Sequence, residues 1–388
     1  MDKFIQNEKG SAILIAMALI AMLSAVALMS VNRSNTDLEM SYNQLHEENA
    51  FYAAEAGVTH ALAELKESPA WRGPIINAAI NDMRYSVDIL DSLLRPALDD
   101  TVLIHATSSR DGAVSEMEAW IAPEYYKPFI FAAYGDDSVT LYNHGCTDSY
   151  NSDSGTYAAT QLNEGGDVGS NGDIKTTNIS TVNGGAQTSD TGGILITHPS
   201  TITGDTTSTA PVYDNSAVSD DEFVWALANS IAPAGFSGDF NYVPGTKALS
   251  VGNSDTLTLA SGVYYLSSIS IGNKGSIKLA PGAKVTIYMT GDLTMNQLSS
   301  VNKGGVPADL IVYSKGSSFT MGQNTTFVGA FWGENANVKL EQSASLYGAA
   351  SGKSAYISNF SCVHFDRSLL KYEAKKIKDM HMIAWRQI

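Results

Sequence analysis

The sequence predicts an α+β protein with a long N-terminal apolar helix, a small antiparallel sheet and a large all-β domain. Residues 12–31 form an unbroken apolar run, and helix-compatible sequence continues from it to about residue 66. From about Phe129 onward, strand-like runs of four or five residues alternate with Gly-Asn and Asn-Gly turns. The spacing of apolar residues and the chemistry of the turns distinguish the helix from the short strands.

The 388-residue chain is acidic but poor in charge. It has 24 Lys and Arg residues against 40 Asp and Glu residues, a formal charge of −16, and only 16% of its residues are charged. Broad nucleic-acid binding needs a basic surface that displaces counterions from phosphates, so this composition argues against it. A hydrophobic content of 44% is sufficient for a folded core. A polar surface rich in Ser, Thr, Asn and Gly is typical of secreted β proteins.

The apolar run predicts a membrane-spanning helix at residues 12–31. It contains only two polar residues, Ser24 and Ser30, and no strong small-residue cleavage site follows it. At a rise of about 1.5 Å per residue the run is about 30 Å long, which is the thickness of a bilayer core. Representative residues of this membrane and filament-core helix are Ala12, Ile15, Leu19, Leu23 and Val31.

A single helix is expected to continue from the membrane run to residue 66. Residues 36–65 contain no proline and one glycine, Gly57, and their apolar residues recur mostly at steps of three and four. Pro69 and Pro74 then end the helical pattern. A plain membrane anchor followed by a stalk helix would show the same pattern.

Residues 67–128 predict a small antiparallel sheet. Three runs alternate apolar and polar residues, and Arg110-Asp111-Gly112 makes a hairpin turn between the last two runs. The three runs are Arg84–Leu90, Thr101–Ser108 and Ala113–Ile121. The expected arrangement is the long helix packed on this sheet.

The N-terminus resembles that of a type IV prepilin. The residues that carry the resemblance are Lys9, Gly10 and Ser11, followed by the apolar run. In that family a prepilin peptidase cuts after the glycine. The resemblance therefore implies a leader at residues 1–10 and a processing site between Gly10 and Ser11.

A second segment is similar to PilX-type minor pilins. Residues 51–57 read Phe-Tyr-Ala-Ala-Glu-Ala-Gly, similar to the A-F-x-A-A-E-A segment of that group, and Glu39 falls where the group has its T-x-x-E motif. The implied motif residues are Glu39, Ala53, Ala54 and Glu55. Major pilins carry a glutamate at the fifth mature position, where this chain has Ile15. The role given to that glutamate in the family is to pair with the N-terminal amine of a neighbouring subunit, because an unpaired charge is costly in lipid. Its absence indicates a subunit at the tip or in low copy.

The largest domain is predicted to be a β-solenoid at residues 129–367, with a β-sandwich as the alternative. Short strands separated by residues that tolerate positive φ favour the solenoid. A helical insertion is expected at about 220–231, capped by Asp220 or Asp221 and bracketed by prolines. In the C-terminal half, residues 262–266 (Gly-Val-Tyr-Tyr-Leu), 329–333 (Gly-Ala-Phe-Trp-Gly) and 363–366 (Val-His-Phe-Asp) resemble segments of a solenoid module that is attached to PilX-like N-termini in some bacteria. Residues 368–388 are expected to form a basic tail and a last strand.

No catalytic residue, cofactor or metal is predicted. Lyases with a parallel β-helix need strong cationic bases, yet no arginine occurs between Asp111 and Asp366. The paired carboxylates at residues 136–137 and 220–222 are explained more simply as turn and helix-cap residues. We therefore expect a protein that is not an enzyme.

Cys146 and Cys362 leave three alternatives open. They are a candidate disulfide, or a zinc site together with His144 and His364, or two unpaired thiols. Unpaired thiols are favoured, because the ends of a solenoid usually lie far apart.

The expected function is that of a minor pilin-like structural subunit of a type IV pilus or related filament, acting in pilus assembly, priming or surface adhesion. The expected partners are other pilins and minor pilins, the prepilin peptidase, the inner-membrane assembly machinery, and surface glycans or host and abiotic surfaces, with no nucleic acid. The chain would cross the bacterial inner membrane once before assembly and then reach the cell surface in an extracellular pilus. The alternatives are a membrane-anchored carbohydrate-active β-helix enzyme and a glycan-binding adhesin.

Overall fold

The computed structural model describes residues 8–90, 101–216, 218–234, 236–237 and 240–388. These residues divide into two compact units. The first unit consists of the chain up to Glu124 together with Ile377–Ile388. The second unit comprises Tyr125–Lys376. The all-β unit is therefore inserted between two segments of the first unit. Most of the predicted leader lies outside the described residues.

The first unit contains one long helix, α1 (Glu8–Glu67), and a five-stranded sheet. The part of α1 from Ala12 onward is the one described helix that is long and apolar enough to cross a membrane. The strand order is β1-β2-β3-β4-β29, and β1 to β4 pair antiparallel. The strands are β1 (Ile75–Ile80), β2 (Met83–Leu90), β3 (Val102–Arg110), β4 (Ala113–Tyr125) and β29 (Ile377–Gln387). The tail thus supplies the fifth strand of the sheet.

Small residues bring α1 close to the sheet. Ala54 and Ala61 are fully buried, and they pack with Val58 and Leu65 against β2, β3 and β4. A side chain at Gly57 would place its Cβ 2.9 Å from the Tyr85 ring, so the contact requires glycine. Close packing of this kind is sensitive to single methylene groups.

The second unit is a stack of coils in which each strand pairs in parallel with the equivalent strand of the next coil. Leu249 pairs with Ile269, and Ile269 pairs with Leu293, along one side of the stack. For coils that follow one another in sequence, the step between such partners ranges from 17 residues (338 to 355) to 35 residues (139 to 174). These parallel registers are the arrangement of a β-solenoid, and the expected fold class of a long apolar helix, a small antiparallel sheet and a large all-β domain is confirmed.

Each coil contributes to three ladders of strands. The first ladder comprises β16 (Ala248–Val251), β19 (Ser268–Ile271), β22 (Leu293–Met295), β25 (Ser318–Met321), the ends of β26 (Thr326–Leu340), β27 (Ser345–Ser358) and β5 (Ala133–Tyr142), then β8 (Asp173–Thr177) and β11 (Ile194–Ile196). The second comprises β17 (Thr256–Leu259), β20 (Ser276–Leu279), β23 (Ser300–Val301), the starts of β26 and β27, β28 (Cys362–Asp366), β6 (Cys146–Tyr150), β9 (Thr181–Val182) and β12 (Thr201–Ile202). The third comprises β18 (Gly262–Leu266), β21 (Val285–Met289), β24 (Leu310–Ser314), the middles of β26 and β27, the start of β5, β7 (Val168–Ser170), β10 (Ala186–Thr188) and β13 (Thr206–Thr207).

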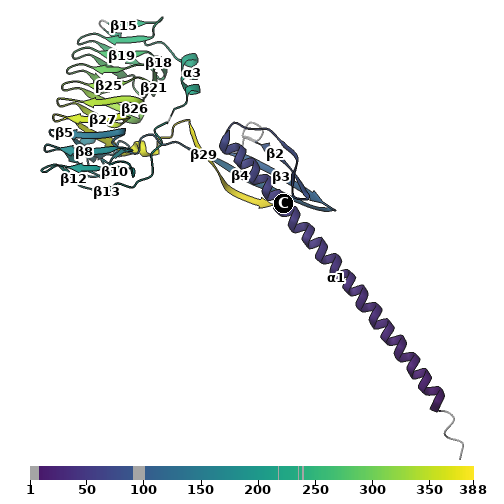
Figure 1. Ribbon diagram of the computed structural model, residues 1–388. Helices are drawn as coiled ribbons and strands as arrows, with labels where there is room; N and C mark the ends of the chain where they lie inside the picture. Colours follow the sequence, from purple (N-terminus) through teal and green to yellow (C-terminus); the bar gives the residue numbers. More distant parts are fainter. Residues whose placement is uncertain (1–7, 91–100, 217, 235, 238–239) are drawn as a thin grey trace, which may run out of the picture. The chain divides into compact units, whose positions relative to one another are not determined.

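The chain enters this stack in its middle. It winds through β5 to β13 towards one end, and then crosses to the opposite end at β14 (Phe236–Ser237) and β15 (Phe240–Val243). It winds back through β16 to β28, so that β27 pairs with β5 and β28 pairs with β6. Figure 1 shows β15 and β13 at opposite ends of the stack and β5 beside β27. The first and last coils that the chain forms are therefore neighbours.

The connection between the two ends of the stack carries the predicted helical insertion. It forms α3 (Asp220–Asn229), and the side chain of Ser219 accepts the cap hydrogen bond from the Glu222 backbone N–H. The cap was expected at Asp220 or Asp221, one or two residues later. Phe223 is buried edge-on against the Tyr288 ring, which fixes α3 to the side of the stack. Short helices elsewhere in the described residues are α2 (Tyr157–Thr160), η2 (Pro307–Asp309) and η3 (Arg367–Lys371).

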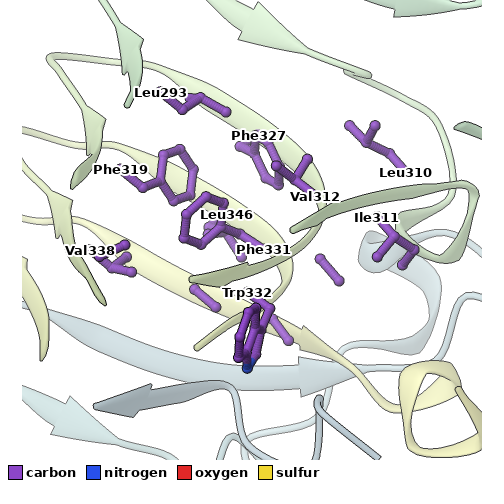
Figure 2. Close-up of a cluster of buried hydrophobic side chains, with 14 of the residues drawn as sticks. Leu293, Leu310, Ile311, Val312, Phe319, Phe327, Phe331, Trp332, Val338 and Leu346 are labelled. Atoms are coloured by element: carbon purple, nitrogen blue, oxygen red, sulfur yellow. The ribbon is translucent and has the colours of Figure 1, made fainter. Parts of the chain in front are cut away.

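The interior of the stack is filled by side chains from all three ladders. Figure 2 shows Phe319, Phe327 and Phe331 meeting in the centre of the coils. The ring centroids of Phe319 and Phe331 lie 4.4 Å apart, and those of Phe319 and Phe327 lie 5.1 Å apart. Because three ladders face one axis, each coil needs only one or two inward apolar residues per strand, which explains the weak sequence repeat.

Candidate functional site

The pilin-like motif lies where α1 meets the sheet of the first unit. Ala53 and Ala54 are buried in this contact, whereas Glu39 and Glu55 are exposed. The two alanines thus serve helix–sheet packing. Gly10 lies within the described start of α1, but no side chain is described for residues up to Ser11, so the processing site stays a prediction.

Within the described part of the chain, the apolar run of α1 packs against no other element. Ile15, Leu19, Leu23 and Val31 are each more than half exposed, and Ala12 is exposed as well. A helix that is apolar on all sides is stable in lipid or among other apolar helices. The exposed run therefore provides a surface for a membrane or for neighbouring subunits.

The two cysteines form a disulfide between neighbouring coils. Cys146 on β6 pairs in register with Cys362 on β28, and their Cα atoms lie 4.5 Å apart. The expectation of unpaired thiols is wrong, because the chain enters the stack in its middle and later returns to the neighbouring coil. The distance is within the range that disulfides require.

The histidines beside the cysteines have other partners. The His144 ring stacks on Phe360 at 4.4 Å, and His364 Nδ1 lies 2.7 Å from Asp148 Oδ1. With both thiols in the disulfide, the suggested zinc site loses its sulfur ligands. Among the described residues no group of three or more His, Cys, Asp and Glu side chains could hold a metal ion.

The paired carboxylates also have structural partners. Asp136 Oδ1 accepts hydrogen bonds from the Tyr134 hydroxyl at 3.2 Å and from Asn171 Nδ2 at 2.7 Å. Asp137 lies 3.7 Å from Lys353 Nζ. Asp220 begins α3 and forms an ion pair with Lys315.

A large pocket opens on the second unit beside the first and last coils. Its volume is about 710 Å³. The lining residues come from β6 and the segment after it, from the turn at 303–306, and from β26 and β27. They are Tyr150, Ser152, Gly155, Thr156, Tyr157, Ala158, Lys303, Gly304, Gly305, Val306, Thr326, Val328 and Tyr347. Small-molecule pockets commonly measure about 300–1,000 Å³, so this pocket is large enough for a ligand.

A buried carboxylate fixes one wall of this pocket, which we call the tyrosine pocket. Asp148 is 6% exposed and accepts hydrogen bonds from the Tyr157 hydroxyl at 2.7 Å and from Gln161 Nε2 at 3.0 Å. His364 contacts the other oxygen of the same carboxylate, and the Tyr157 and Tyr347 rings pack against the His364 ring with centroids 4.4 and 4.5 Å away. The wall is thus held by a connected hydrogen-bond network.

The tyrosines of the pocket are neutral phenols at ordinary pH. Burial, followed by the hydrogen bond to Asp148 and the charge of that carboxylate, raises the pKa of Tyr157 above its usual value. Burial and the Asp148 charge also raise the pKa of Tyr347. Both side chains therefore present an uncharged aromatic face and a hydroxyl group.

The sequence analysis did not identify the tyrosine pocket. Its residues lie at positions 150–158, 303–306, 326–328 and 347, and parallel pairing of distant strands brings them together. The coil that contains the first of these residues is longer than its neighbours, because Cys146 pairs with Thr181, 35 residues further along the chain. An interval much longer than its neighbours indicates an insertion, and insertions on solenoids often lie at binding faces.

Comparisons with known proteins describe one part of the chain. A family model described as a domain of unknown function (DUF7305) matches residues 267–372. No curated protein matches the chain.

Several solved structures are similar to the chain, among them a pilin and an ice-binding protein. The competence-associated pilin ComZ from Thermus thermophilus aligns with 11% identity over 88% of this chain and 98% of that chain, at a TM-score of 0.28. An ice-binding protein from the Antarctic ascomycete Antarctomyces psychrotrophicus aligns with 17% identity over 63% of this chain and 98% of that chain, at a TM-score of 0.35. At such scores we derive no function from either protein.

Proposed function

We propose that this chain is a minor pilin-like structural subunit of a type IV pilus or a related filament. The observation that carries the proposal is the division of α1. Its N-terminal part is an exposed apolar surface, and its C-terminal part packs through Ala53, Ala54 and Val58 on an antiparallel sheet. One rigid element thereby joins a membrane or filament segment to a folded domain.

The N-terminal segment first holds the subunit in the inner membrane as a single span. Cleavage after Gly10 by a prepilin peptidase then leaves Ser11 as the mature N-terminus, as the prepilin-like sequence implies. The apolar surface from Ala12 to Val31 moves from lipid to the apolar helices of other pilins and minor pilins, with the aid of the inner-membrane assembly machinery. Both environments avoid exposure of the run to water.

The absence of a glutamate at Ile15 supports a role at the tip or in low copy. A subunit that lacks this carboxylate does not need a neighbour's amine to neutralise it within the apolar core. Such a subunit suits the start of assembly, and the second unit is then displayed on the cell surface. We propose a role in priming or surface adhesion without catalysis.

Mass spectrometry of the chain, co-expressed with a prepilin peptidase, tests the proposal. The expected mature protein begins at Ser11, and a Gly10→Leu variant should retain Met1 because a bulky residue occupies the cleavage position. A Gly245→Leu variant, changed at an exposed turn position with open space around it, is the control and should be cleaved like the wild type. Retention of Met1 by the wild-type chain in the presence of active peptidase would contradict the pilin proposal.

Recovery of the chain in purified filaments provides a second measurement. A Leu19→Arg variant should be reduced in filaments, because a charge at the centre of an apolar helix costs roughly 2.5–3.5 kcal/mol. Leu195→Arg changes an exposed leucine of the second unit and should leave recovery unchanged. Equal recovery of both variants would argue that the apolar run has no place in a filament core.

A further inference from the structure

The tyrosine pocket has two aromatic walls that meet at a right angle. The Tyr157 and Tyr347 ring centroids lie 5.2 Å apart at an interplanar angle of 78°. The Tyr150 ring is edge-on to both, at 5.4 Å from Tyr157 and 6.3 Å from Tyr347. Tyr150 is buried and supports the corner, whereas Tyr157 and Tyr347 are half-buried and line the pocket.

These walls are fixed in the absence of a ligand. Tyr157 is held at its hydroxyl by Asp148 and at its ring by His364, and Tyr347 stacks on the same histidine. Binding therefore need not order these side chains, and less of the interaction energy is lost to conformational entropy.

Polar groups surround the aromatic corner. Thr156 and Thr326 are among the residues that line the pocket, as is Ser152, whose Oγ donates a hydrogen bond to Asp366 Oδ2 at 2.6 Å. Neutral hydroxyl and aromatic groups together match a ligand that combines apolar C–H faces with hydroxyl groups. A sugar ring has this combination.

Lys303 is the one charged residue among those that line the pocket. It is exposed on the turn that also contains Gly304 and Gly305, and none of the ion pairs of the described residues involves it. On a chain with a formal charge of −16, a single cation in an otherwise uncharged pocket favours an anionic group of the ligand.

We propose that the tyrosine pocket binds a carboxylate-bearing sugar, such as a uronate residue of a glycan. One face of the sugar ring packs in the corner formed by Tyr157 and Tyr347, and its carboxylate pairs with the Lys303 ammonium group. The volume of about 710 Å³ leaves room for an adjoining sugar residue. This inference concerns the second unit alone and does not depend on the proposed pilin function.

Calorimetric titration of the full chain with a uronate trisaccharide tests the inference. The chain should be held in nanodiscs or a zwitterionic detergent, because glucoside and maltoside detergents carry sugars that compete for the pocket. The comparison ligand is a neutral trisaccharide of the same linkage. We expect tighter binding of the uronate, and weaker binding of it as salt concentration rises.

Three variants with matched controls locate the binding. Tyr347→Ala should weaken uronate binding about tenfold or more, because it removes one aromatic wall. Lys303→Gln should weaken it about two- to fivefold, as expected for an exposed ion pair. Tyr157→Phe keeps the ring and removes the hydrogen bond to Asp148, so it should retain binding even if alanine at this position prevents folding. Tyr142→Ala and Lys339→Gln change exposed residues outside the pocket and should change affinity less than twofold.

Each outcome bears directly on the inference. The inference is supported if the wild type binds the uronate, Tyr347→Ala loses most of this binding and Lys303→Gln weakens it. Equal binding of the neutral trisaccharide, or unchanged affinity in Lys303→Gln, overturns the assignment of an acidic ligand. Failure of the folded chain to bind either trisaccharide at millimolar concentration overturns the assignment of a sugar site. Equal losses of affinity in the control variants Tyr142→Ala and Lys339→Gln would show that the sugar does not bind in the tyrosine pocket.

Discussion

Removal of the Cys146–Cys362 disulfide should destabilise the second unit. The bond joins coils that neighbour each other in space but are separated by 216 residues in sequence. In the double variant Cys146→Ala/Cys362→Ala the same coils remain paired in the folded state, whereas the unfolded chain gains the freedom to separate them. The effect therefore acts mainly through the unfolded state.

The length of the closed loop determines the magnitude. Loop-closure entropy corresponds to about 3 kcal/mol for a loop of about 15 residues and about 4.7 kcal/mol for a loop of about 100 residues. For a separation of 216 residues the same relation gives about 5 kcal/mol. Measured values are often about 2–4 kcal/mol, so we expect a loss of about 2–5 kcal/mol in the free energy of unfolding. At an m-value of about 2 kcal/mol per molar urea, the midpoint falls by about 1–2.5 M.

Hydrogen exchange in increasing urea, resolved by peptide mass spectrometry, measures this change separately in each unit. Peptides from β24 to β27 should lose protection at lower urea in the double variant. Peptides from β2 to β4 should be unchanged, because neither cysteine belongs to the first unit. Dithiothreitol should shift the wild-type midpoint to that of the variant and should leave the variant unchanged.

Two results would refute this reasoning. If reduction lowers the free energy of unfolding of the wild type by less than about 0.5 kcal/mol, the bond does not restrain the unfolded chain. If the double variant loses protection equally in both units, the destabilisation does not arise from the loop in the second unit.

Two further predictions concern polar side chains of the second unit. Asn215 Oδ1 accepts hydrogen bonds from Trp332 Nε1 at 3.0 Å and from Ser351 Oγ at 2.9 Å, so Asn215→Ala should lower the free energy of unfolding in urea by about 1–3 kcal/mol. The control Asn273→Ala, in an exposed turn, should change it by less than about 0.5 kcal/mol, and equal effects of the two variants would contradict the role of these hydrogen bonds. Burial raises the pKa of Tyr213 to about 12, whereas an unfolded tyrosine titrates near about 10. The stability that the neutral phenol contributes is therefore complete below pH ~10 and is lost as the pH rises towards ~12. Between these pH values the free energy of unfolding should fall less steeply with pH in Tyr213→Phe than in the wild type. Parallel curves for the two proteins would disprove the raised pKa of Tyr213.

The local elements of the first unit could be predicted from sequence because their signals are local. The apolar run and the absence of proline up to Leu65 define α1, and Asp111 and Gly112 have the positive φ values that the predicted hairpin turn requires. Strand β1 was missed because Asn77 and two alanines interrupt its isoleucines and break the alternation of apolar and polar residues. Asn77 has a positive φ there, and the register shifts between Ile75 and Ala78.

The order of the coils and the tyrosine pocket could not be predicted in the same way. Pairing of β28 with β6 depends on contacts across 216 residues, and many alternative registers satisfy the same pattern of short apolar strands. The pocket depends on that order, because it combines Tyr150 from the beginning of the unit with Tyr347 from near its end. A chain that wound once from end to end would separate these residues.

The position of the disulfide determines how the second unit responds to mechanical force. The unit is attached to the rest of the chain at Tyr125 and Lys376, and backbone hydrogen bonds of Tyr126 with Ala374 and Lys376 join the two connections. A pull on either connection can extend the chain only as far as the nearer cysteine, since tension then passes through the covalent bond. The coils between Cys146 and Cys362 therefore carry no tension. Reduction would release a contour length of roughly 70 nm, at about 3.4 Å for each of the 216 residues, so the oxidised form is nearly inextensible by comparison.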